Sequence, residues 1–299
     1  MKILVSGSSG LIGKELVKSL ENDGNEVILL VRNNINKEEK NIYWNYETQE
    51  IETEKLESLD VVIHLAGENL STGKWTKEKK QKIFDSRVSG SKFLCETLSS
   101  LNNPPKVFIS ASAVGYYGDR NDEILTEESE QGKGFLADVC KKWEDASESL
   151  LKTDTKVINA RFGIILSKNG GLISKVIFQF YMGFGGKIGS GKQYMSWIML
   201  DDVINAIKHC ISNSEIKGAV NFVSPNPITN LEFTKTLGIL FGKMTIFTLP
   251  KFAVKMAFGE MGNELLLSST RAIPENLIKT GFKFKCKYFE NALRYVLTR

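Results

Sequence analysis

The sequence predicts an α/β fold with a doubly wound parallel sheet, and two observations carry this prediction. The chain opens on an apolar run, Lys2 to Ser6, that leads through a glycine cluster into an amphipathic stretch. Short apolar runs of this kind recur along the chain, and stretches with helical spacing separate most of them. Buried strands joined by helices are typical of parallel sheets, because each parallel crossover needs a dozen or more residues.

The glycine cluster after the first strand predicts a dinucleotide site. The glycines follow the spacing G-x-x-G-x-x-G, and the amphipathic stretch Leu11 to Leu20 comes next. The first glycine allows a sharp turn, the second lets the backbone approach a pyrophosphate, and the third lets the helix pack on the strand. Free amides at the helix N-terminus then bind the phosphates, so we expect cofactor contacts from Gly7, Ser9, Gly10, Leu11, Ile12 and Gly13. The alternative is a glycine turn with only a structural role.

The residue after the second strand favours NADP over NAD. Gly24 ends the first helix, and the strand Val27 to Val31 runs into Arg32. Many dinucleotide sites carry Asp or Glu here to bind the ribose 2′-hydroxyl, whereas Arg32 is followed by Asn33 and Asn34. A guanidinium favours a 2′-phosphate that a carboxylate would repel. The alternative is a solvated surface arginine.

The next clear strand, Asp60 to Gly67, ends in residues with little side-chain bulk. Before it, a short edge strand is predicted at Ile42 to Trp44. Strand ends line the ligand crevice of a doubly wound sheet, so the cofactor is predicted to pass Leu65, Ala66 and Gly67. His64 is predicted to be a satisfied core histidine rather than a catalyst.

A long helix is predicted from Thr76 to Leu98, with Thr76 as its N-cap. Lys82, Ser86 and Arg87 share one side of this helix by their i, i+4 and i+5 spacing. We predict that this side faces the cofactor, with a solvated charged face as the alternative.

The strand Lys106 to Ala111 brings a hydroxyl and two phenols to the same crevice, from Ser112, Tyr116 and Tyr117. After a predicted helix at 135–151, the strand Val157 to Phe162 carries Arg161. A buried arginine needs an anionic partner, because an unpaired buried charge is costly. That partner is either a phosphate of the cofactor or substrate, or a structural carboxylate.

The rest of the chain continues less regularly. The stretch from Gly170 to Gly191, rich in glycine and aromatic residues, predicts a mobile loop over the site. The segment Trp197 to Val203 is predicted to begin a short strand and then a helix capped by Asp201 or Asp202. Another strand, at 218–223, is followed by predicted helices at 229–241 and within 249–299, the latter broken at Pro274.

Composition excludes several classes of protein. The net charge of the 299 residues is +4 with no basic block, which argues against a nucleic-acid partner. The four cysteines share no close spacing and only two histidines occur, so we expect no metal site and no disulfide framework. The first strand begins at residue 2 and no apolar run reaches spanning length, so we expect no signal peptide, no membrane partner and a cytoplasmic protein.

The order of these segments resembles the extended short-chain dehydrogenase/reductase superfamily. It is most similar to the epimerase-like branch of nucleoside-diphosphate-sugar epimerases and cell-division-inhibitor-related proteins. The matching motifs include the glycine triplet, Leu65-Ala66-Gly67-Glu68-Asn69, Ser86-Arg87-Val88, Ser112-x-x-Gly115-Tyr116-Tyr117-Gly118, Phe135-Leu136-Ala137, Trp143-Glu144, Arg161-x-Gly163 and Pro225-x-Pro227-x-Thr229-Asn230.

The resemblance implies an NADP-binding Rossmann domain, 1–165 plus 196–223, and a smaller C-terminal substrate domain, 166–195 plus 224–299. It also implies NADP contacts from Arg32, Leu65, Ala66, Arg87 and Arg161. The implied activity is that of an NADP-dependent epimerase-like oxidoreductase on a small-molecule substrate, either a sugar nucleotide or a small carbonyl or polyol compound.

The catalytic signature departs from the superfamily, whose members typically use Ser or Thr, a Tyr acid/base and a Lys four residues after the Tyr. That lysine lowers the pKa of the phenol so that it transfers a proton near neutral pH. Ser112 matches the first position, but no tyrosine of this chain has a lysine four positions later. We hypothesise that Tyr116 or Tyr117 supplies the phenol and that Lys141 or Lys142 lends the charge. The alternative function is a non-catalytic NADP-binding sensor or regulatory protein.

Overall fold

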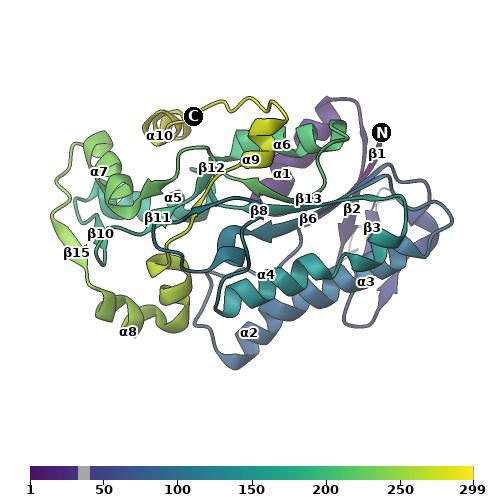
Figure 1. The fold of residues 1–299 in the computed structure, drawn as a ribbon, viewed down its shortest axis with the longest axis horizontal. Helices are drawn as coiled ribbons and strands as arrows, with labels where there is room; N and C mark the ends of the chain where they lie inside the picture. The colour runs from purple at the N-terminus through teal and green to yellow at the C-terminus, as the bar shows by residue number, and fades with distance from the viewer. Residues whose placement is uncertain (33–40, 299) are drawn as a thin grey trace.

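A computed structural model describes residues 1–32 and 41–298, and its centre is an eight-stranded sheet (Figure 1). Six neighbouring strand pairs are parallel, and only the outermost pair, β3 with β4, is antiparallel. The prediction of a doubly wound parallel sheet is confirmed. In sheet order the strands are β13 (Gly218–Phe222), β8 (Lys156–Phe162), β6 (Val107–Ala113), β5 (Val61–His64), β1 (Lys2–Ser6), β2 (Glu26–Val31), β3 (Asn41–Asn45) and β4 (Glu50–Ile51).

Helices cover both faces of the sheet (Figure 1). On one face lie α1 (Leu11–Asn22), α6 (Leu200–Ser212) and the short α9 (Glu275–Lys279). On the other lie α2 (Lys77–Phe84), α3 (Gly90–Ser99) and α4 (Phe135–Asp145). Each face has its own apolar core because side chains alternate along a strand.

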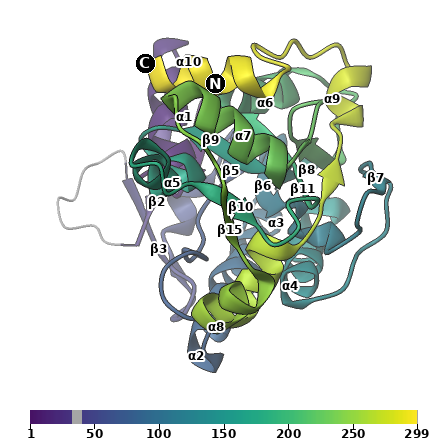
Figure 2. The same cartoon turned by 90° about the vertical axis from the view of Figure 1, so that its left-hand side faces the viewer.

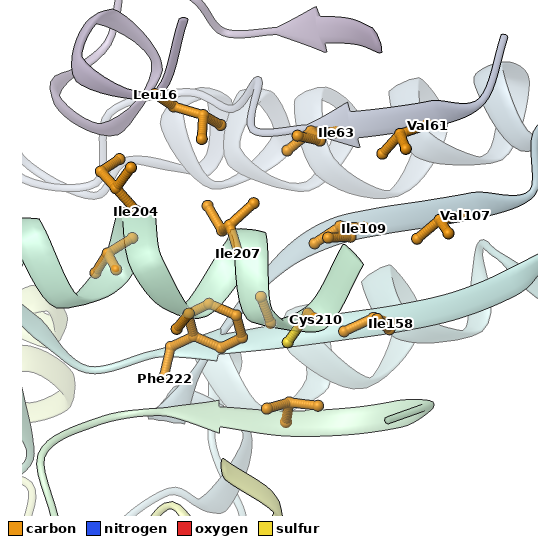
Figure 3. Packing of buried hydrophobic residues seen from close by; sticks show 14 of the residues in the cluster. Leu16, Val61, Ile63, Val107, Ile109, Ile158, Ile204, Ile207, Cys210 and Phe222 are labelled. Atoms are coloured by element: carbon orange, nitrogen blue, oxygen red, sulfur yellow. The ribbon is translucent and has the colours of Figure 1, made fainter. Parts of the chain in front are cut away.

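The alternation is clear in β1. Ile3 and Val5 pack with Leu16 of α1 and Ile207 of α6 on one face, whereas Leu4 packs with Leu94 of α3 on the other. Figure 3 shows the first of these clusters, with aliphatic side chains of three strands pointing at α1 and α6. Parallel strands buried on both faces need such continuous apolar runs.

The predicted helix from Thr76 is interrupted once. Thr76 is its N-cap as predicted, since the Thr76 side chain accepts a hydrogen bond from the backbone N–H of Lys79 at 3.2 Å. A π-helical turn, Asp85–Ser89, separates α2 from α3. The turn contains Ser86 and Arg87, and π-helical turns of this kind occur frequently at functional sites.

A second, smaller core lies beyond the carboxyl ends of the strands. It contains α5 (Gly171–Tyr181), α7 (Asn230–Phe241) and α10 (Phe289–Thr298), whereas α8 (Lys251–Gly262) lies apart from them, next to α2 (Figure 2). Short strand pairs complete this part: β9 (Ile164–Ser167) with β12 (Trp197–Met199), β10 (Gly186–Ile188) with β15 (Phe247–Leu249), and β11 (Tyr194–Met195) with β14 (Ile228–Thr229). A further pair joins β7 (Ile124–Leu125) to β16 (Arg271–Ala272).

The prediction of a loop from Gly170 to Gly191 is wrong. Its first half is helix α5, which buries Ile173 and Phe180 on one side, and β10 follows. The glycines at the two ends of the stretch masked this helical spacing.

Three smaller differences concern element ends. The N-cap of α6 is Met199, with Asp201 and Asp202 inside the first turn instead of capping it. Helix α4 ends at Asp145, and a 3-10 turn at Glu148–Lys152 replaces its predicted last residues. Strand β3 is not at the edge of the sheet, because β4 pairs outside it.

Within residues 1–32 and 41–298, no helix combines the length and hydropathy needed to cross a bilayer.

Candidate functional site

The corner between β1 and α1 leaves no room for side chains at two of its glycines. Gly7 has a φ of +68°, and a Cβ there would lie 2.8 Å from the carbonyl carbon of Leu65. A Cβ on Gly13 would lie 2.2 Å from the carbonyl oxygen of Gly7. The three backbone segments therefore touch because glycine occupies both positions.

The outer side of the same corner is open. Ser9 and Gly10 are exposed, and Gly10 donates its N–H to Gly7 O at 3.0 Å. Gly10 is the N-cap of α1, and no side chain of the described residues caps this helix. The amides of Leu11 and Ile12 are therefore available to an anion, which fits the phosphates of a dinucleotide.

Ser6 and His64 fix the strand end that faces this corner. Ser6 Oγ accepts N–H bonds from Leu65 at 3.1 Å and Ala66 at 3.2 Å, and it bonds His64 Nδ1 at 2.7 Å. Since the Ser6 oxygen accepts two N–H groups, its own hydrogen donates to Nδ1, which requires a neutral ring. His64 is fully buried, as predicted, but its Nε2 has no hydrogen-bond partner within the described residues, so it is a core histidine that is satisfied at Nδ1 only. Ser6 in turn holds the backbone at Leu65 and Ala66.

Burial lowers the pKa of His64 from 6.5 to about 4. Between these two values the unfolded chain binds more protons than the folded one, so the free energy of unfolding falls as the pH drops. We expect a loss of about 2 kcal/mol between pH 7 and pH 5, measured by urea denaturation. The matched variants are His64→Gln, in which this component disappears, and His209→Gln, in which it remains. Equal pH slopes in the two variants would contradict the assignment.

The two predicted arginines of the crevice differ in environment. Arg32 is exposed directly after β2, and Asn33 and Asn34 lie outside the described residues. Arg87 is half-buried, and its guanidinium carbon lies 5.1 Å from the Trp143 ring centroid and within 3.4 Å of a Cβ built on Gly67. Among the described residues no carboxylate forms an ion pair with Arg87. Burial lowers its pKa, and an anion in the crevice would restore the favourable environment of the charge.

Lys82 and Ser86 do not share the surroundings of Arg87. Lys82 is exposed, which agrees with the solvated alternative for this side chain. Ser86 is buried and accepts the N–H of Glu68 at 3.0 Å. Sequence reasoning missed Lys79, which forms an ion pair of 2.5 Å with Glu68 and orders the segment after β5.

Arg161 has a structural carboxylate partner. Its Nε and Nη2 donate to Glu144 Oε1 and Oε2 at 2.8 and 2.7 Å, and both side chains are nearly buried. This bidentate pair compensates the buried charge without a phosphate, so the argument that Arg161 requires an anionic ligand no longer holds. A contact between Arg161 and a cofactor stays a prediction. The same Glu144 oxygen, Oε1, accepts a hydrogen bond of 2.7 Å from Ser112 Oγ.

The two candidate phenols are not equivalent. Tyr117 is fully buried, donates to Asn221 Oδ1 at 2.8 Å and accepts from Arg161 Nη1 at 2.9 Å. Burial raises its pKa to about 12, so Tyr117 is unsuited to proton transfer near neutral pH. Tyr116 is half-buried, and the guanidinium of Arg161 lies 3.6 Å from its ring centroid. Tyr116 is therefore the better acid/base candidate.

Neither predicted lysine lies beside Ser112. Lys141 forms an ion pair with Asp145 on the outer side of α4, and Lys142 lies 5.3 Å from the Phe84 ring centroid. The buried side of α4 instead presents Leu136 and Cys140, four residues apart, to Gly115. Burial raises the pKa of the Cys140 thiol to about 12, so this thiol does not act as an anion at neutral pH. The pKa of Lys141 is raised mainly by its hydrogen bond to Asp145 and also by its electrostatic interaction with Tyr116, so the hypothesis that Lys141 or Lys142 lends charge to a phenol stays a prediction.

A hollow of about 470 Å³ lies where α2, α4 and α8 meet, and it is lined by Trp75, Lys77, Lys80, Gln81, Phe84, Phe135 and Glu260. Lys80 bridges this junction through an ion pair of 2.9 Å with Glu260. Close by, Glu264 in the π-helical turn after α8 accepts the N–H groups of Phe135 and Leu136, both at 3.2 Å. A carboxylate from the C-terminal part thus caps α4. Over the two described ranges, no group of three or more His, Cys, Asp or Glu side chains could hold a metal ion.

Comparison with known proteins shows which family the chain resembles in sequence. The family model described as "NAD dependent epimerase/dehydratase family" matches residues 3–222, and a second model, a domain of unknown function (DUF1731), matches residues 249–296. The epimerase family protein ML0860 of Mycobacterium leprae is 38% identical over 298 residues, which cover 99% of this chain and 96% of that protein.

Solved structures agree with these matches. Human epimerase family protein SDR39U1, crystallised with NADPH, superposes with a TM-score of 0.91 at 28% identity and covers 100% of this chain and 99% of that one. The UDP-glucose 4-epimerase of Thermotoga maritima shares the fold, with a TM-score of 0.79 at 18% identity, 100% coverage of this chain and 98% of that one. The resemblance to extended short-chain dehydrogenases/reductases is confirmed, and the chain belongs to the NAD dependent epimerase/dehydratase family.

Proposed function

We propose that this protein is an NADP-dependent oxidoreductase of the epimerase type that acts on a sugar nucleotide or a small carbonyl or polyol compound. The observation that carries the proposal is the glycine turn at the start of α1, where Gly10 is exposed and no side chain of the described residues caps the helix. Within the described ranges, neither Arg32 nor Arg87 forms an ion pair with a carboxylate. The human relative crystallised with NADPH supports the same cofactor.

The residues of the crevice divide the work of holding this cofactor. The amides at the start of α1 would bind the pyrophosphate, and Arg32 would bind the 2′-phosphate. The backbone of Leu65 and Ala66 would contact the cofactor. The guanidinium of Arg87, which lies next to Gly67 and over the Trp143 ring, adds positive charge to the crevice. When bound, the nicotinamide supplies or accepts the hydride.

Ser112 and Tyr116 act on the substrate oxygen in this proposal. Ser112 Oγ is held by Glu144, and the Arg161 guanidinium over the Tyr116 ring stabilises negative charge that develops on the phenol during proton transfer. Arg161 would thus take over part of the task that the usual lysine performs. The hollow beside Phe135 has aromatic walls for a base or sugar and lysines for phosphates, which suits a sugar nucleotide.

The cofactor preference is tested by Arg32→Ala. We expect NADPH affinity to fall by about 30-fold and NADH affinity to change less than about twofold, because only NADPH carries the phosphate that the guanidinium pairs with. Isothermal titration calorimetry of the wild type and the variant with both cofactors gives the two ratios. An equal loss for NADH and NADPH would rule out a 2′-phosphate contact.

The catalytic role is tested by Tyr116→Phe. We expect a fall in kcat of at least about 100-fold on whichever sugar nucleotide or carbonyl compound the wild type turns over, with unchanged NADPH affinity. Tyr288→Phe is the matched control, because the Tyr288 side chain is 65% exposed. Full activity of Tyr116→Phe would remove Tyr116 from the mechanism.

A second function is favoured by one observation. The buried side of α4 carries Leu136 and Cys140 beside Gly115, and neither side chain transfers a proton at neutral pH. A non-catalytic NADP(H) sensor would bind the cofactor at the same corner. Tight NADPH binding without turnover of any compound in a sugar-nucleotide and carbonyl panel would favour the sensor.

A further inference from the structure

One end of the molecule exposes a strip of large apolar side chains, which we call the apolar face. It consists of Phe178, Phe184, Met244, Ile246, Phe252 and Met256, each between 66% and 77% exposed. They belong to α5, to the segments next to α5 and β15, and to α8, and Figure 2 shows these elements together on the side toward the viewer. Apolar exposure on this scale marks an interaction site.

Part of the apolar face is held together by β10 and β15. Strand β10, just after Phe184, pairs with β15, and the Phe184 and Phe247 rings are 6.4 Å apart. A shallow hollow of about 540 Å³ lies beside Met244 and Ile246 and is flanked by Lys235 and Lys243. The segments around β10 and β15 therefore bring Phe184, Met244 and Ile246 to neighbouring elements, with Lys235 and Lys243 beside the hollow.

Lysines outnumber acidic residues in the two stretches that form the apolar face, with the exposed Glu232 and Glu260 at the ends of the second stretch. The sequence contains no Asp or Glu between Asp154 and Asp201 or between Glu232 and Glu260, the two stretches from which this face is built. Exposed lysines occur in both stretches, at Lys175, Lys235, Lys243, Lys251 and Lys255. An apolar strip bordered by lysines fits a partner that offers a nonpolar interior beneath anionic groups.

We propose that the apolar face docks on an anionic lipid surface. A second copy of this chain fits less well, because a two-fold contact would bring the lysines of the two copies toward one another. The phosphates of a lipid headgroup layer supply negative charge for these lysines, and Phe, Met and Ile side chains enter the upper acyl region. This peripheral contact requires no spanning helix, but it departs from the expectation of no membrane partner, which rested on the lack of an apolar run of spanning length.

Co-sedimentation of the full chain with vesicles tests the proposal. We expect binding to vesicles with roughly one-third phosphatidylglycerol, weak binding to pure phosphatidylcholine, and reversal by about 0.5 M salt. The pair Lys243→Gln and Lys251→Gln should weaken binding about 25-fold, since each lysine near the surface contributes about fivefold. The pair Met244→Ser and Ile246→Ser should weaken it at least about tenfold.

Matched controls lie elsewhere on the surface. Ile124→Ser with Leu151→Ser removes apolar side chains that are 54% and 65% exposed, and Lys92→Gln with Lys106→Gln removes lysines whose side chains are 65% and 80% exposed. Both control pairs should bind vesicles like the wild type, and every variant should keep its NADPH affinity because the substitutions lie outside the glycine corner. Failure to bind vesicles, or equal binding to both lipids, would overturn the proposal. A dimer in light scattering that Met244→Ser with Ile246→Ser converts to monomer would assign the face to a second copy.

Discussion

Gly13→Ala is expected to abolish NADPH binding, with a loss of affinity of at least about 100-fold, or about 2.7 kcal/mol. The added Cβ would lie 2.2 Å from Gly7 O and 2.6 Å from Ser8 Cα, so both backbone segments must move apart. Movement of Gly7 displaces the turn that presents the α1 amides, and it separates the turn from Leu65. Calorimetric titration of NADPH into the wild type and the variant measures the loss.

Gly90→Ala is the matched control for this substitution. Gly90 also lies in a helix, with a φ of −63°, and its added Cβ would meet no atom closer than 3.5 Å. Alanine is the better helix former, so this variant should bind NADPH normally and unfold at an equal or higher temperature. Unchanged NADPH affinity in Gly13→Ala would show that the cofactor does not depend on the close contact of helix and turn.

Glu144→Gln is expected to lower the free energy of unfolding by about 3 to 5 kcal/mol. The substitution keeps the volume but leaves the guanidinium of Arg161, which is 4% exposed, without its charged partner. Ser112 and both donor nitrogens of Arg161 lose an anionic acceptor at the same time. Urea denaturation at neutral pH measures the change.

The matched control is Asp145→Asn at the next residue of α4. The ion pair of Asp145 with Lys141 is about half exposed on both sides, and its loss should cost less than about 1 kcal/mol. The double variant Glu144→Leu with Arg161→Met should recover part of the stability lost in Glu144→Gln, because no buried charge remains. A cost below 1 kcal/mol for Glu144→Gln would show that water reaches the guanidinium.

The sequence predicts the sheet and the cofactor corner well because local rules govern both. The run at β1 and the glycine spacing that follows lie within a dozen residues, and each glycine has a backbone reason that one strand–turn–helix unit contains. His64 was predictable for a similar reason, since an isolated histidine within an apolar strand normally belongs to the core.

The parts that the sequence did not predict depend on contacts between distant segments. Arg161 pairs with Glu144 from another element, and Tyr117 reaches Asn221 across 104 positions, so neither partner is visible in a local pattern. The same holds for α4, where helix periodicity alone did not show that Lys141 and Lys142 lie on its outer side. The helix α5 was missed because its flanking glycines outweighed a short apolar spacing.

The carboxylate of Glu264 gives the first turn of α4 an unusual dependence. Helices are commonly capped by a residue of their own chain segment. The amides of Phe135 and Leu136 are instead capped by a residue that lies 129 and 128 positions later in the sequence. If α8 moves away from α4, the first turn of α4 also loses its hydrogen-bond acceptor, Glu264. The exchange rates of the Phe135 and Leu136 amide protons, measured without ligand, would therefore report how often Glu264 separates from α4.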